Sequence, residues 1–548
     1  MAKIKIFSLG GLNESGKNMY VVDVDNDLFI FDAGLKYAND KLFGIDYIIP
    51  DFTFIKENIK RIKGIFITHG HQKAMGAICD IVREIKDINI YSCKFTCDIL
   101  RRNFIDEEIE FNNLHEIEPH KKIDFGKNSI FPIRLTHSIP DNVGYVLNTE
   151  DGAIVYTGNF VFDSSMQGAY ETDIGKLAYI GKQKVLCLLS ESEYADRPGY
   201  TVPNNRIAFV ARDILMHSEG RIIITVFSAH ISRIQELLTE VMATQRRVII
   251  MGKKLQEMIN YVIDNNYVKF DKERIGTLNN INDKDAIILI SNENEKPFAN
   301  LERIVNGYDK YIKIEETDTV FYLDPVSTNQ EMIAVKLSDE IAKIGAKTIS
   351  LSPKKYLMNH ASIEDLMLMI NLMKPKYYFP VIGEYRHQVA NADIAYGMSM
   401  KKENIILKQN GEVATFVNGE LTDDVEKIKI NEILIDGNTT KDIGELVLRD
   451  RELLSENGIV IVCATVGKKN KKVVAGPEII TRGFIYVKEN ADFINQIKDI
   501  CLEIINNNIS INYVDYNKIK NDVREELGNF FFNETECKPM IITIINEI

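Results

Sequence analysis

Three histidines of this chain could together hold a metal ion. His69 and His71 follow a short apolar segment, residues 64–68, which predicts a buried strand whose carboxyl end opens into a loop. Residues two apart in an extended segment point the same way, so the two imidazoles can aim at one point. His137 follows another apolar run and offers a third imidazole. Three imidazoles are enough to bind one zinc ion.

The loop that carries the first two histidines departs from a two-metal loop at two positions. Hydrolase loops that bind two metal ions run His-x-His-x-Asp-His. Here Lys73 stands at the position of the Asp and Ala74 at that of the last His. Neither an ammonium nor a methyl group donates a lone pair to a metal at neutral pH. The sequence therefore predicts a metal site that has lost half of its loop ligands.

The elements around this loop follow an α/β pattern. Short β-branched runs alternate with amphipathic helices after residue 204, which indicates a largely parallel sheet. The clearest of these elements are a helix at 206–218, a strand at 221–225, a helix at 232–243 and a strand at 247–251. A strand at 377–381 follows later. The tail predicts a separate α+β domain with helices at 447–455, 491–506 and 516–529 and a last strand at 540–544.

Composition bounds the class of protein. The chain has 548 residues, too many for one core, and we expect about three units. No run approaches the roughly 20 apolar residues of a membrane span. Seven cysteines without regular spacing fit a reducing cytoplasm, so we expect a cytoplasmic protein without membrane contact. The net charge of −13 argues against non-specific coating of nucleic acid but allows RNA to bind in a local groove.

Several strings along the whole chain resemble one family. The chain is similar to bacterial ribonuclease J, a group of β-CASP nucleases with a metallo-β-lactamase fold. It resembles in particular the second, degraded paralogue of bacteria that carry two. The matching strings occur in the family's order, at residues 9–19, 31–35, 44–51, 233–235, 372–376, 383–386, 449–451 and 481–484.

The resemblance implies a fold and a set of domain boundaries. It implies an α/β protein in which a metallo-β-lactamase αββα sandwich receives an inserted β-CASP α/β domain and is followed by a small α+β C-terminal domain. The expected ranges are 1–203 and 356–420 for the lactamase-like domain, 204–355 for the β-CASP domain, 421–447 for a linker and 448–548 for a C-terminal assembly domain.

The resemblance also assigns the metal positions. Asp32 supports the metal site, and the ligands of the first metal, His69, His71 and His137, are all present. Ligands of the second metal are replaced at four positions, namely Lys73, Ala74, Asn159 and Ile382. Asn159 stands for a bridging Asp, whose negative charge holds two cations close together. We therefore expect no two-metal centre, and either no ion or a single zinc or manganese ion.

The resemblance also implies that residues which bind the RNA phosphate in the family are partly replaced in this chain. His360, Ser228 and Glu191 keep residue types that the family uses near the RNA phosphate. In the family pattern Ala229 and Met358 stand at Ser positions, Tyr356 stands at a His position and Asn359 at a Gly position. A methyl or thioether group cannot bind a 5′-phosphate as a hydroxyl does.

Lys73 itself has two interpretations. Its ammonium could occupy the place of the second metal and neutralise Asp32, which would hold the pocket together without a cofactor. Alternatively, Lys73 points to solvent through a widened mouth.

These observations lead to three hypotheses of function. The first is a catalytically impaired ribonuclease J subunit that acts in RNA maturation and mRNA decay by pairing with an active paralogue, as a homodimer or hetero-oligomer that contacts RNA. The second is a weak 5′-to-3′ exoribonuclease or endoribonuclease with a single metal ion. The third is an interaction scaffold that no longer touches RNA, which a titration with RNA at several salt concentrations would test.

Overall fold

The computed structural model divides the chain into two compact units. It describes residues 2–38, 44–293, 298–327, 330–437, 445–484, 491–509 and 515–548. The first unit comprises Met1–Tyr37 and Asp46–Ile433, and the second comprises Ala38–Ile45 and Leu434–Ile548. Within the described part of the chain, no helix is both long and apolar enough to cross a membrane.

Two sheets form the centre of the first unit. The first sheet has the order β21-β20-β1-β2-β3-β6-β7-β8 and the second has the order β19-β13-β12-β11-β10-β9. The first is built from β1 (Lys3–Gly10), β2 (Met19–Val24), β3 (Asp27–Phe31), β6 (Ile62–Phe66), β7 (Ile90–Cys93), β8 (Leu114–Ile117), β20 (Ala414–Val417) and β21 (Glu420–Leu421). The second contains β9 (Ile123–Phe125), β10 (Asn128–Arg134), β11 (Val143–Thr149), β12 (Gly152–Tyr156), β13 (Val185–Glu191) and β19 (Tyr377–Val381).

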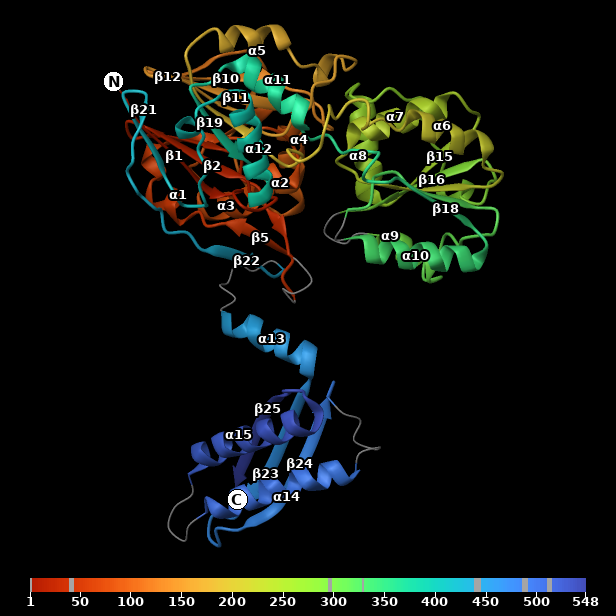
Figure 1. The fold of residues 1–548 in the computed structure, drawn as a ribbon. Helices are drawn as coiled ribbons and strands as arrows, with labels where there is room; N and C mark the ends of the chain where they lie inside the picture. Colours follow the sequence, from red (N-terminus) through yellow and green to blue (C-terminus); the bar gives the residue numbers. More distant parts are fainter. Residues whose placement is uncertain are drawn as a thin grey trace. The chain divides into compact units, whose positions relative to one another are not determined.

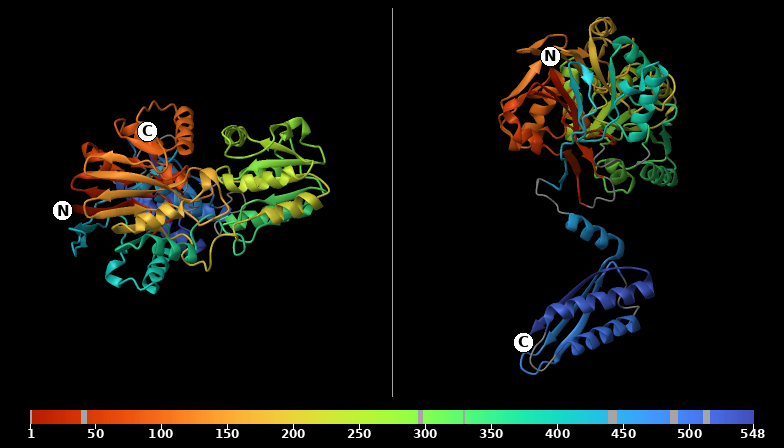
Figure 2. Two further views of the ribbon diagram at one scale, coloured as in Figure 1. Left: turned by 90° about the horizontal axis from the view of Figure 1, so that it is seen from above. Right: turned by 60° about the vertical axis from the view of Figure 1, so that its left-hand side comes forward.

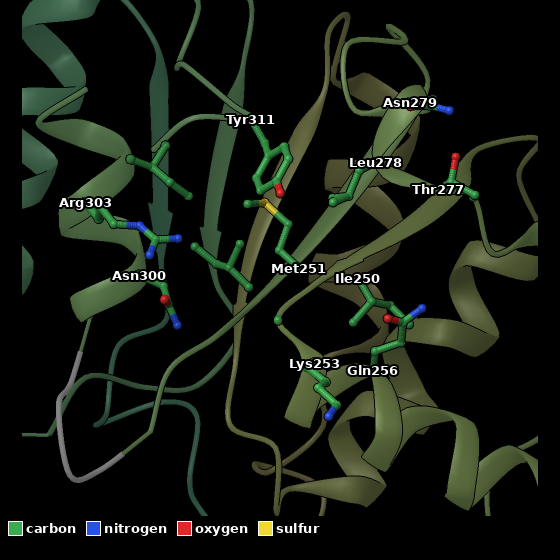
Figure 3. A pocket seen from close by; sticks show the side chains of 14 residues that line it. Ile250, Met251, Lys253, Gln256, Thr277, Leu278, Asn279, Asn300, Arg303 and Tyr311 are labelled. Atoms are coloured by element: carbon green, nitrogen blue, oxygen red, sulfur yellow. The ribbon is translucent and has the colours of Figure 1, made fainter. Parts of the chain in front are cut away.

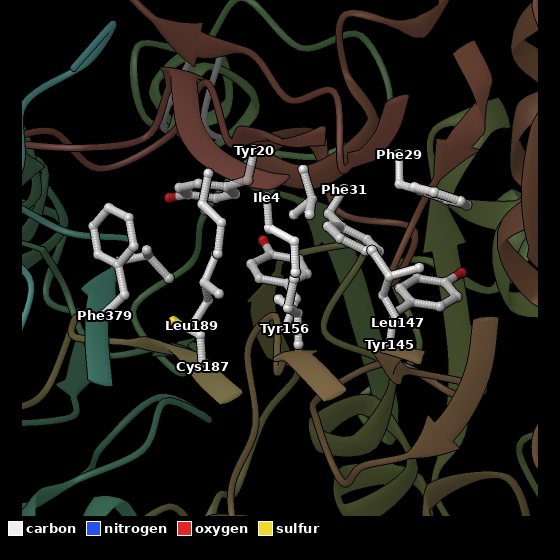
Figure 4. Close-up of a cluster of buried hydrophobic side chains, with 14 of the residues drawn as sticks. Ile4, Tyr20, Phe29, Phe31, Tyr145, Leu147, Tyr156, Cys187, Leu189 and Phe379 are labelled. Carbon is white, nitrogen blue, oxygen red and sulfur yellow. The ribbon is translucent and has the colours of Figure 1, made fainter. Parts of the chain in front are cut away.

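An apolar core rich in aromatic rings joins the two sheets face to face (Figure 4). The Phe31 ring from the first sheet stacks on Tyr145 and Tyr156 of the second, with ring centroids 5.8 Å and 5.6 Å apart. Each such ring stabilises the fold by about 1.5–3 kcal/mol when it is removed from water. The core between the sheets thus consists of packed apolar and aromatic side chains. The loops of the candidate site lie at the strand ends next to this core.

Helices cover the outer faces of these sheets. A second apolar cluster joins α5 (Ile174–Gly181), α11 (Ile363–Met373) and α12 (Tyr385–Gly397) to the second sheet (Figure 1). On the first sheet, α4 (Lys94–Asp106) packs on β7 and β8. Three short helices, α1 (Thr53–Glu57), α2 (Gln72–Met75) and α3 (Ile78–Glu84), lie between the strands along the chain. The helix–sheet–sheet–helix order confirms the predicted αββα sandwich.

A five-stranded parallel sheet forms the insert between β13 and α11. Its order is β15-β16-β14-β17-β18, from β14 (Ile222–Val226), β15 (Arg247–Met251), β16 (Ala286–Ser291), β17 (Thr319–Tyr322) and β18 (Lys347–Ser350). One face packs on α6 (Ala208–His217), α7 (Ile231–Met242) and α8 (Lys253–Asp264). The other packs on α9 (Ala299–Val305) and α10 (Glu331–Ile344). In Figures 1 and 2 this insert appears as the yellow-to-green body with its own sheet.

The predicted elements of the insert and of the return strand are confirmed. The parallel sheet matches the alternation of helices and strands between 206 and 251. After the insert, β19 returns to the lactamase-like sheet and pairs with β13 in parallel, with Leu189 opposite Phe379. Because the strands of the insert are all parallel, their carboxyl ends share one edge. The loop after β14 extends from that edge toward the candidate site.

The second unit is a small α+β domain. Its sheet has the order β24-β23-β25, from β23 (Ile459–Val466), β24 (Val473–Arg482) and β25 (Met540–Glu547). Its helices are α13 (Glu445–Asn457), α14 (Ala491–Asn507) and α15 (Tyr516–Thr535), and the last two bury an apolar face on the sheet. Within the linker expected at 421–447, β22 (Glu432–Ile435) spans the boundary between the units, and residues 438–444 lie outside the described ranges. Residues 485–490 and 510–514 of the expected C-terminal domain also lie outside them.

Close backbone contact fixes the loop of the histidines against the first sheet. The N–H groups of Ala33 and Leu35 donate to the carbonyls of Ala74 and Gln72, at 2.7 Å and 2.9 Å. A Cβ atom on Gly34 would lie only 1.6 Å from the carbonyl oxygen of Lys73. Only glycine fits there, so α2 lies directly on the segment after β3.

Candidate metal centre

The three histidines lie together at the carboxyl end of β6. Beyond β6 the backbone is buried, and the carbonyl of Ile67 accepts hydrogen bonds from Ser92 Oγ at 2.9 Å and Tyr145 Oη at 2.7 Å. The next residues, His69 and His71, therefore leave a fixed strand end. The loop after β10 brings His137 to the same place.

The arrangement of the three imidazoles fits one metal ion. Their ring centroids are 4.7 Å, 4.9 Å and 5.0 Å apart, and one nitrogen from each lies within 4.8 Å of the others. His137 Nε2 and His71 Nδ1 are 3.2 Å apart. A tetrahedral zinc ion with bonds of 2.0–2.1 Å places its nitrogen ligands about 3.3 Å from one another. The spacing thus suits a zinc ion, which would act there as a Lewis acid.

Burial keeps these imidazoles neutral. It lowers the pKa of His69 and His137 well below the ordinary value, and neighbouring histidines lower both further. Burial also lowers the pKa of His71 to about 3, although a hydrogen bond with the carbonyl of Ala229 opposes the shift. A neutral imidazole has one nitrogen with a free lone pair, which is the form that binds a metal.

Asp32 orients His69 through Thr68. The buried Asp32 carboxylate accepts from the backbone N–H of Thr68 at 2.8 Å, from the Thr68 hydroxyl at 2.9 Å and from Tyr156 Oη at 2.6 Å. Burial raises the pKa of Asp32 to about 7 even though these hydrogen bonds lower it. Because the Thr68 hydroxyl donates to Asp32, it accepts from His69 Nδ1 at 2.8 Å. His69 Nε2 then carries the lone pair, and it is buried without a hydrogen-bond partner.

Lys73 pairs with a carboxylate that the sequence did not indicate. Its Nζ lies 3.1 Å from Glu193 Oε1 and 2.7 Å from Ser15 Oγ, and Ser15 in turn donates to Glu193. Burial raises the pKa of Glu193, but Lys73 and the hydrogen bond from Ser15 outweigh it and lower that pKa to about 2. The Lys73 side chain is 41% exposed.

The partner of Lys73 is one that neither sequence interpretation named. Asp32 receives its hydrogen bonds from Thr68 and Tyr156, and Lys73 does not neutralise it. Nor does Lys73 simply point to solvent, because its ammonium is held by Glu193 and Ser15. The only sequence signal for Glu193 is that it lies two residues after Glu191 at the end of β13. Lys73 is 120 residues away in the chain, so spacing could not pair them.

The side chains at the other three replaced positions are a buried methyl group, an amide and a buried aliphatic chain. Ala74 is fully buried in α2, and Asn159 donates its amide to Glu191 Oε2 at 2.7 Å. Ile382 is buried in the core between the sheets with a φ of +54°. A β-branched residue in this left-handed region costs about 1–2 kcal/mol. Its N–H donates to Tyr20 Oη at 3.0 Å and its carbonyl accepts from Ser192 N–H at 2.9 Å, which holds the conformation.

Of the three residues expected to bind the RNA phosphate, His360 and Glu191 contact each other beside the histidines. His360 Nδ1 lies 2.9 Å from Glu191 Oε2, and the His360 ring centroid is 5.8 Å from that of His137. Glu191 also accepts from the backbone N–H of Phe160 at 2.6 Å, so its carboxylate is used inside the protein. Ser228 lies half-buried in the loop after β14, next to Ala229, whose carbonyl is 3.1 Å from His71 Nε2.

Two positions that depart from the family pattern, Met358 and Asn359, make contacts inside the protein. Met358 Sδ lies 3.6 Å from Arg233 Nη1, and Asn359 bonds to Asn205 at 2.8 Å. The buried Arg233 guanidinium also pairs with Asp324 at 3.0 Å. His230, another residue that sequence reasoning did not select, contacts the same carboxylate through Nδ1 at 2.7 Å. These groups serve the junction between the sandwich and the insert.

Three family models match the chain. They are the Beta-lactamase superfamily domain over residues 29–174, the Ribonuclease J, beta-CASP domain over residues 219–339 and the Ribonuclease J C-terminal domain over residues 446–548.

Known bacterial proteins match over the full length. Ribonuclease J2 of Bacillus subtilis (strain 168) is 37% identical over 551 residues, which covers 100% of this chain and 99% of that protein. Ribonuclease J 2 of Staphylococcus aureus (strain MRSA252) is 35% identical over 552 residues, with coverage of 100% and 98%. A crystal structure of a protein of unknown function from Enterococcus faecalis V583 has the same fold, with a TM-score of 0.54 and 13% identity. It covers 76% of this chain and 100% of that one.

The pair of Lys73 and Glu193 predicts a measurable coupling. Replacing Lys73→Met should lower the free energy of unfolding by about 1–2 kcal/mol at pH 7, because Glu193 loses its cation while the partly exposed Lys73 moderates the loss. The folded pKa of Glu193, about 2, lies below the ordinary 4.5, so the stabilisation is full above about pH 4.5 and is lost as the pH falls toward 2.

Denaturant unfolding of Lys73→Met, Glu193→Gln and the double variant measures this coupling. Lys401→Met is the control, since Lys401 is exposed and only loosely paired with Glu403 at 3.9 Å. Strictly additive effects of the two site substitutions at pH 7 would contradict the assignment of this pair.

Proposed function

The chain belongs to the ribonuclease J family of nucleases, and we propose that within this family it serves as a catalytically impaired subunit that pairs with an active paralogue. Its role would be in RNA maturation and mRNA decay in the cytoplasm. The observation that carries this proposal is the ion pair of Lys73 and Glu193 where a second metal ion would need ligands.

The residues at the second-metal positions argue against two-metal chemistry. Two-metal phosphodiesterases use their ions together to generate hydroxide and to stabilise charge in the transition state. Here the positions hold an ammonium, a buried methyl group, an amide that donates to Glu191 and a side chain in the core. A divalent ion about 4 Å from the Lys73 ammonium would meet a repulsion of roughly 8 kcal/mol at an effective dielectric constant of 20.

The described residues offer one alternative centre. Among the described residues, His69, His71 and His137 form a group of metal-ligating side chains placed closely enough to hold an ion. The free lone pair on buried His69 Nε2 favours a second candidate function, a weak single-metal exoribonuclease or endoribonuclease. Slow cleavage of RNA that disappears both with a chelator and in a His69→Ala variant would support this candidate over an inactive subunit.

Two parts of the chain outside the histidine centre that could serve a partner have well-packed interiors. The C-terminal domain has an apolar core of its own, and the junction between sandwich and insert keeps a dense network around Arg233 and Asp324. We therefore infer that the chain acts through binding, to RNA and to a partner protein, as a homodimer or a hetero-oligomer.

Metal content is the first prediction from this proposal. The purified chain should hold well under two metal ions per protomer, because no carboxylate bridge and no second ligand set are present at the replaced positions. Elemental analysis after dialysis measures this. Any single ion should be lost in His69→Ala, since two imidazoles hold zinc poorly. Two equivalents of zinc or manganese that resist dialysis would contradict the proposal.

The fold should also persist without metal. The aromatic core between the two sheets is complete by itself, so a chelator should change the melting temperature by less than about 5 °C. A larger loss would mean that the ion supports the fold.

Partnership is the third prediction. The chain, co-expressed with an active ribonuclease J, should co-purify with it and change its activity. Deletion from residue 448 onward should reduce assembly but leave the sandwich and insert folded, because the C-terminal domain buries its own core. Size-exclusion chromatography with light scattering measures the assembly, and circular dichroism checks the fold. An active paralogue that elutes separately from the full chain at micromolar concentration would contradict the pairing.

A further inference from the structure

A cavity of about 600 Å³ opens in the insert, apart from the histidine centre (Figure 3). It lies beyond the carboxyl ends of the neighbouring strands β15 and β16, between the first turn of α8 and the body of α9. Its volume lies within the range of about 300–1,000 Å³ that suits a small-molecule ligand.

The strand connections place this cavity at a topological switch point. The strands β15 and β16 are adjacent and parallel. The helix after β15, α8, packs on one face of the sheet, and the helix after β16, α9, packs on the other. The two connections leave in opposite directions and open a crevice outside the strand ends. Open α/β sheets bind their ligands in such crevices.

One side of the cavity is suited to an anion. Lys253 on α8 and Arg303 on α9 line the cavity, and no Asp or Glu of the described part of the chain is among its lining residues. Arg303 already pairs with Asp309 at 2.6 Å, whereas Lys253 is exposed and only loosely paired with Glu257 at 3.8 Å, so Lys253 is the cation that an anion would meet. Gly252 begins the turn into α8 with a φ of +107°, and a Cβ there would meet nothing within 4 Å. An anion can therefore approach the backbone closely, next to the N–H groups of the first turn of α8.

The other side is suited to a flat, partly polar group. Met251 extends toward the ring of Tyr311, and Leu278 faces them across the cavity (Figure 3). Thr277 and Asn279 lie beyond Leu278 on one side of the cavity (Figure 3). Asn300 lies on the other side, and its amide donates to the carbonyl of Ser291 at 3.1 Å. Thioether, aromatic and aliphatic groups contact the face of a nucleobase, while amides and hydroxyls hydrogen-bond to its edge.

We propose that this cavity binds a nucleoside monophosphate unit, with the phosphate near Lys253 and the start of α8 and the base against Met251, Leu278 and Tyr311. The site is separate from the histidine centre and does not depend on the proposed pairing with a paralogue. The same sheet edge continues to the loop after β14, because the N–H of Asn292 after β16 donates to the carbonyl of Val226 at 2.8 Å. The unit can thus come from a free mononucleotide or from single-stranded RNA that crosses this edge.

Calorimetric titration of the full chain with uridine and adenosine 5′-monophosphates, and with the two nucleosides, tests the proposal. Lys253→Glu should weaken nucleotide binding at least about tenfold and leave nucleoside binding nearly unchanged, since it reverses a charge near the phosphate. Leu278→Asp should weaken both. Lys336→Glu is the matched control, because Lys336 is an exposed lysine on α10 of the same insert that does not line the cavity.

The outcomes are distinct. Saturable nucleotide binding that falls in Lys253→Glu and Leu278→Asp, but not in Lys336→Glu, supports the site. Displacement of the bound mononucleotide by a single-stranded oligoribonucleotide then assigns the unit to RNA, and its persistence assigns it to free nucleotide. A Kd above about 10 mM for the unmodified chain would overturn the proposal. So would binding that neither cavity variant changes, because the nucleotide would then occupy another place such as the pocket of His360.

Discussion

The packing of the two sandwich sheets on one another is the constraint that the rest of the first unit depends on. Rings such as Phe31, Tyr145 and Tyr156 fill the space between the sheets, and the loops of the candidate site begin at the strand ends above them. Tyr145 and Tyr156 also hydrogen-bond to the site: Tyr145 donates to the carbonyl of Ile67, and Tyr156 donates to the carboxylate of Asp32. This core consists of side chains from the two sheets, which is why we expect the fold to tolerate replacement of metal ligands. The backbone contact of Gly34 with Lys73 keeps the loop in position whatever side chains it carries.

Charge at the altered centre is balanced by the protein itself. A two-metal site needs carboxylates around its cations, and this chain has the partly buried Glu193 just after the end of β13 and the buried Glu191 at that end. Lys73 and Ser15 neutralise the first, while His360, Asn159 and backbone N–H groups engage the second. The three remaining imidazoles stay neutral through burial. The carboxylates of Glu193 and Glu191 thus have partners within the protein, whereas His69 Nε2 is buried without a hydrogen-bond partner.

The sequence predicted those features that depend on local pattern. The apolar run before His69, the alternation of strands and helices in the insert and the return strand at 377–381 are confirmed, because each follows from spacing within one segment. The structure also gathers His69, His71 and His137 at one point, as spacing and family resemblance had suggested. The partner of Lys73 could not be predicted, since Glu193 meets it only through the fold.

Two further features could not be predicted from local sequence pattern, because they depend on contacts between distant segments. The left-handed backbone of Ile382 is imposed by its hydrogen bonds to Tyr20 and Ser192, and isoleucine itself gives no sign of it. Nor could the cavity beside Gly252 be found, because it depends on the order of β15 and β16 in the sheet and on the opposite directions of α8 and α9.

The central claim is that this member of the ribonuclease J family lacks the two-metal chemistry of a full nuclease. The most direct measurement is the rate at which the purified, unmodified chain degrades 5′-monophosphorylated single-stranded RNA, beside an intact family member prepared in the same way and free of contaminating paralogue. Loss of cooperating catalytic groups predicts a rate lower by about 10⁴-fold or more. A rate within about tenfold of the intact enzyme would contradict the account, because it would require transition-state stabilisation that the residues at positions 73, 74, 159 and 382 do not supply.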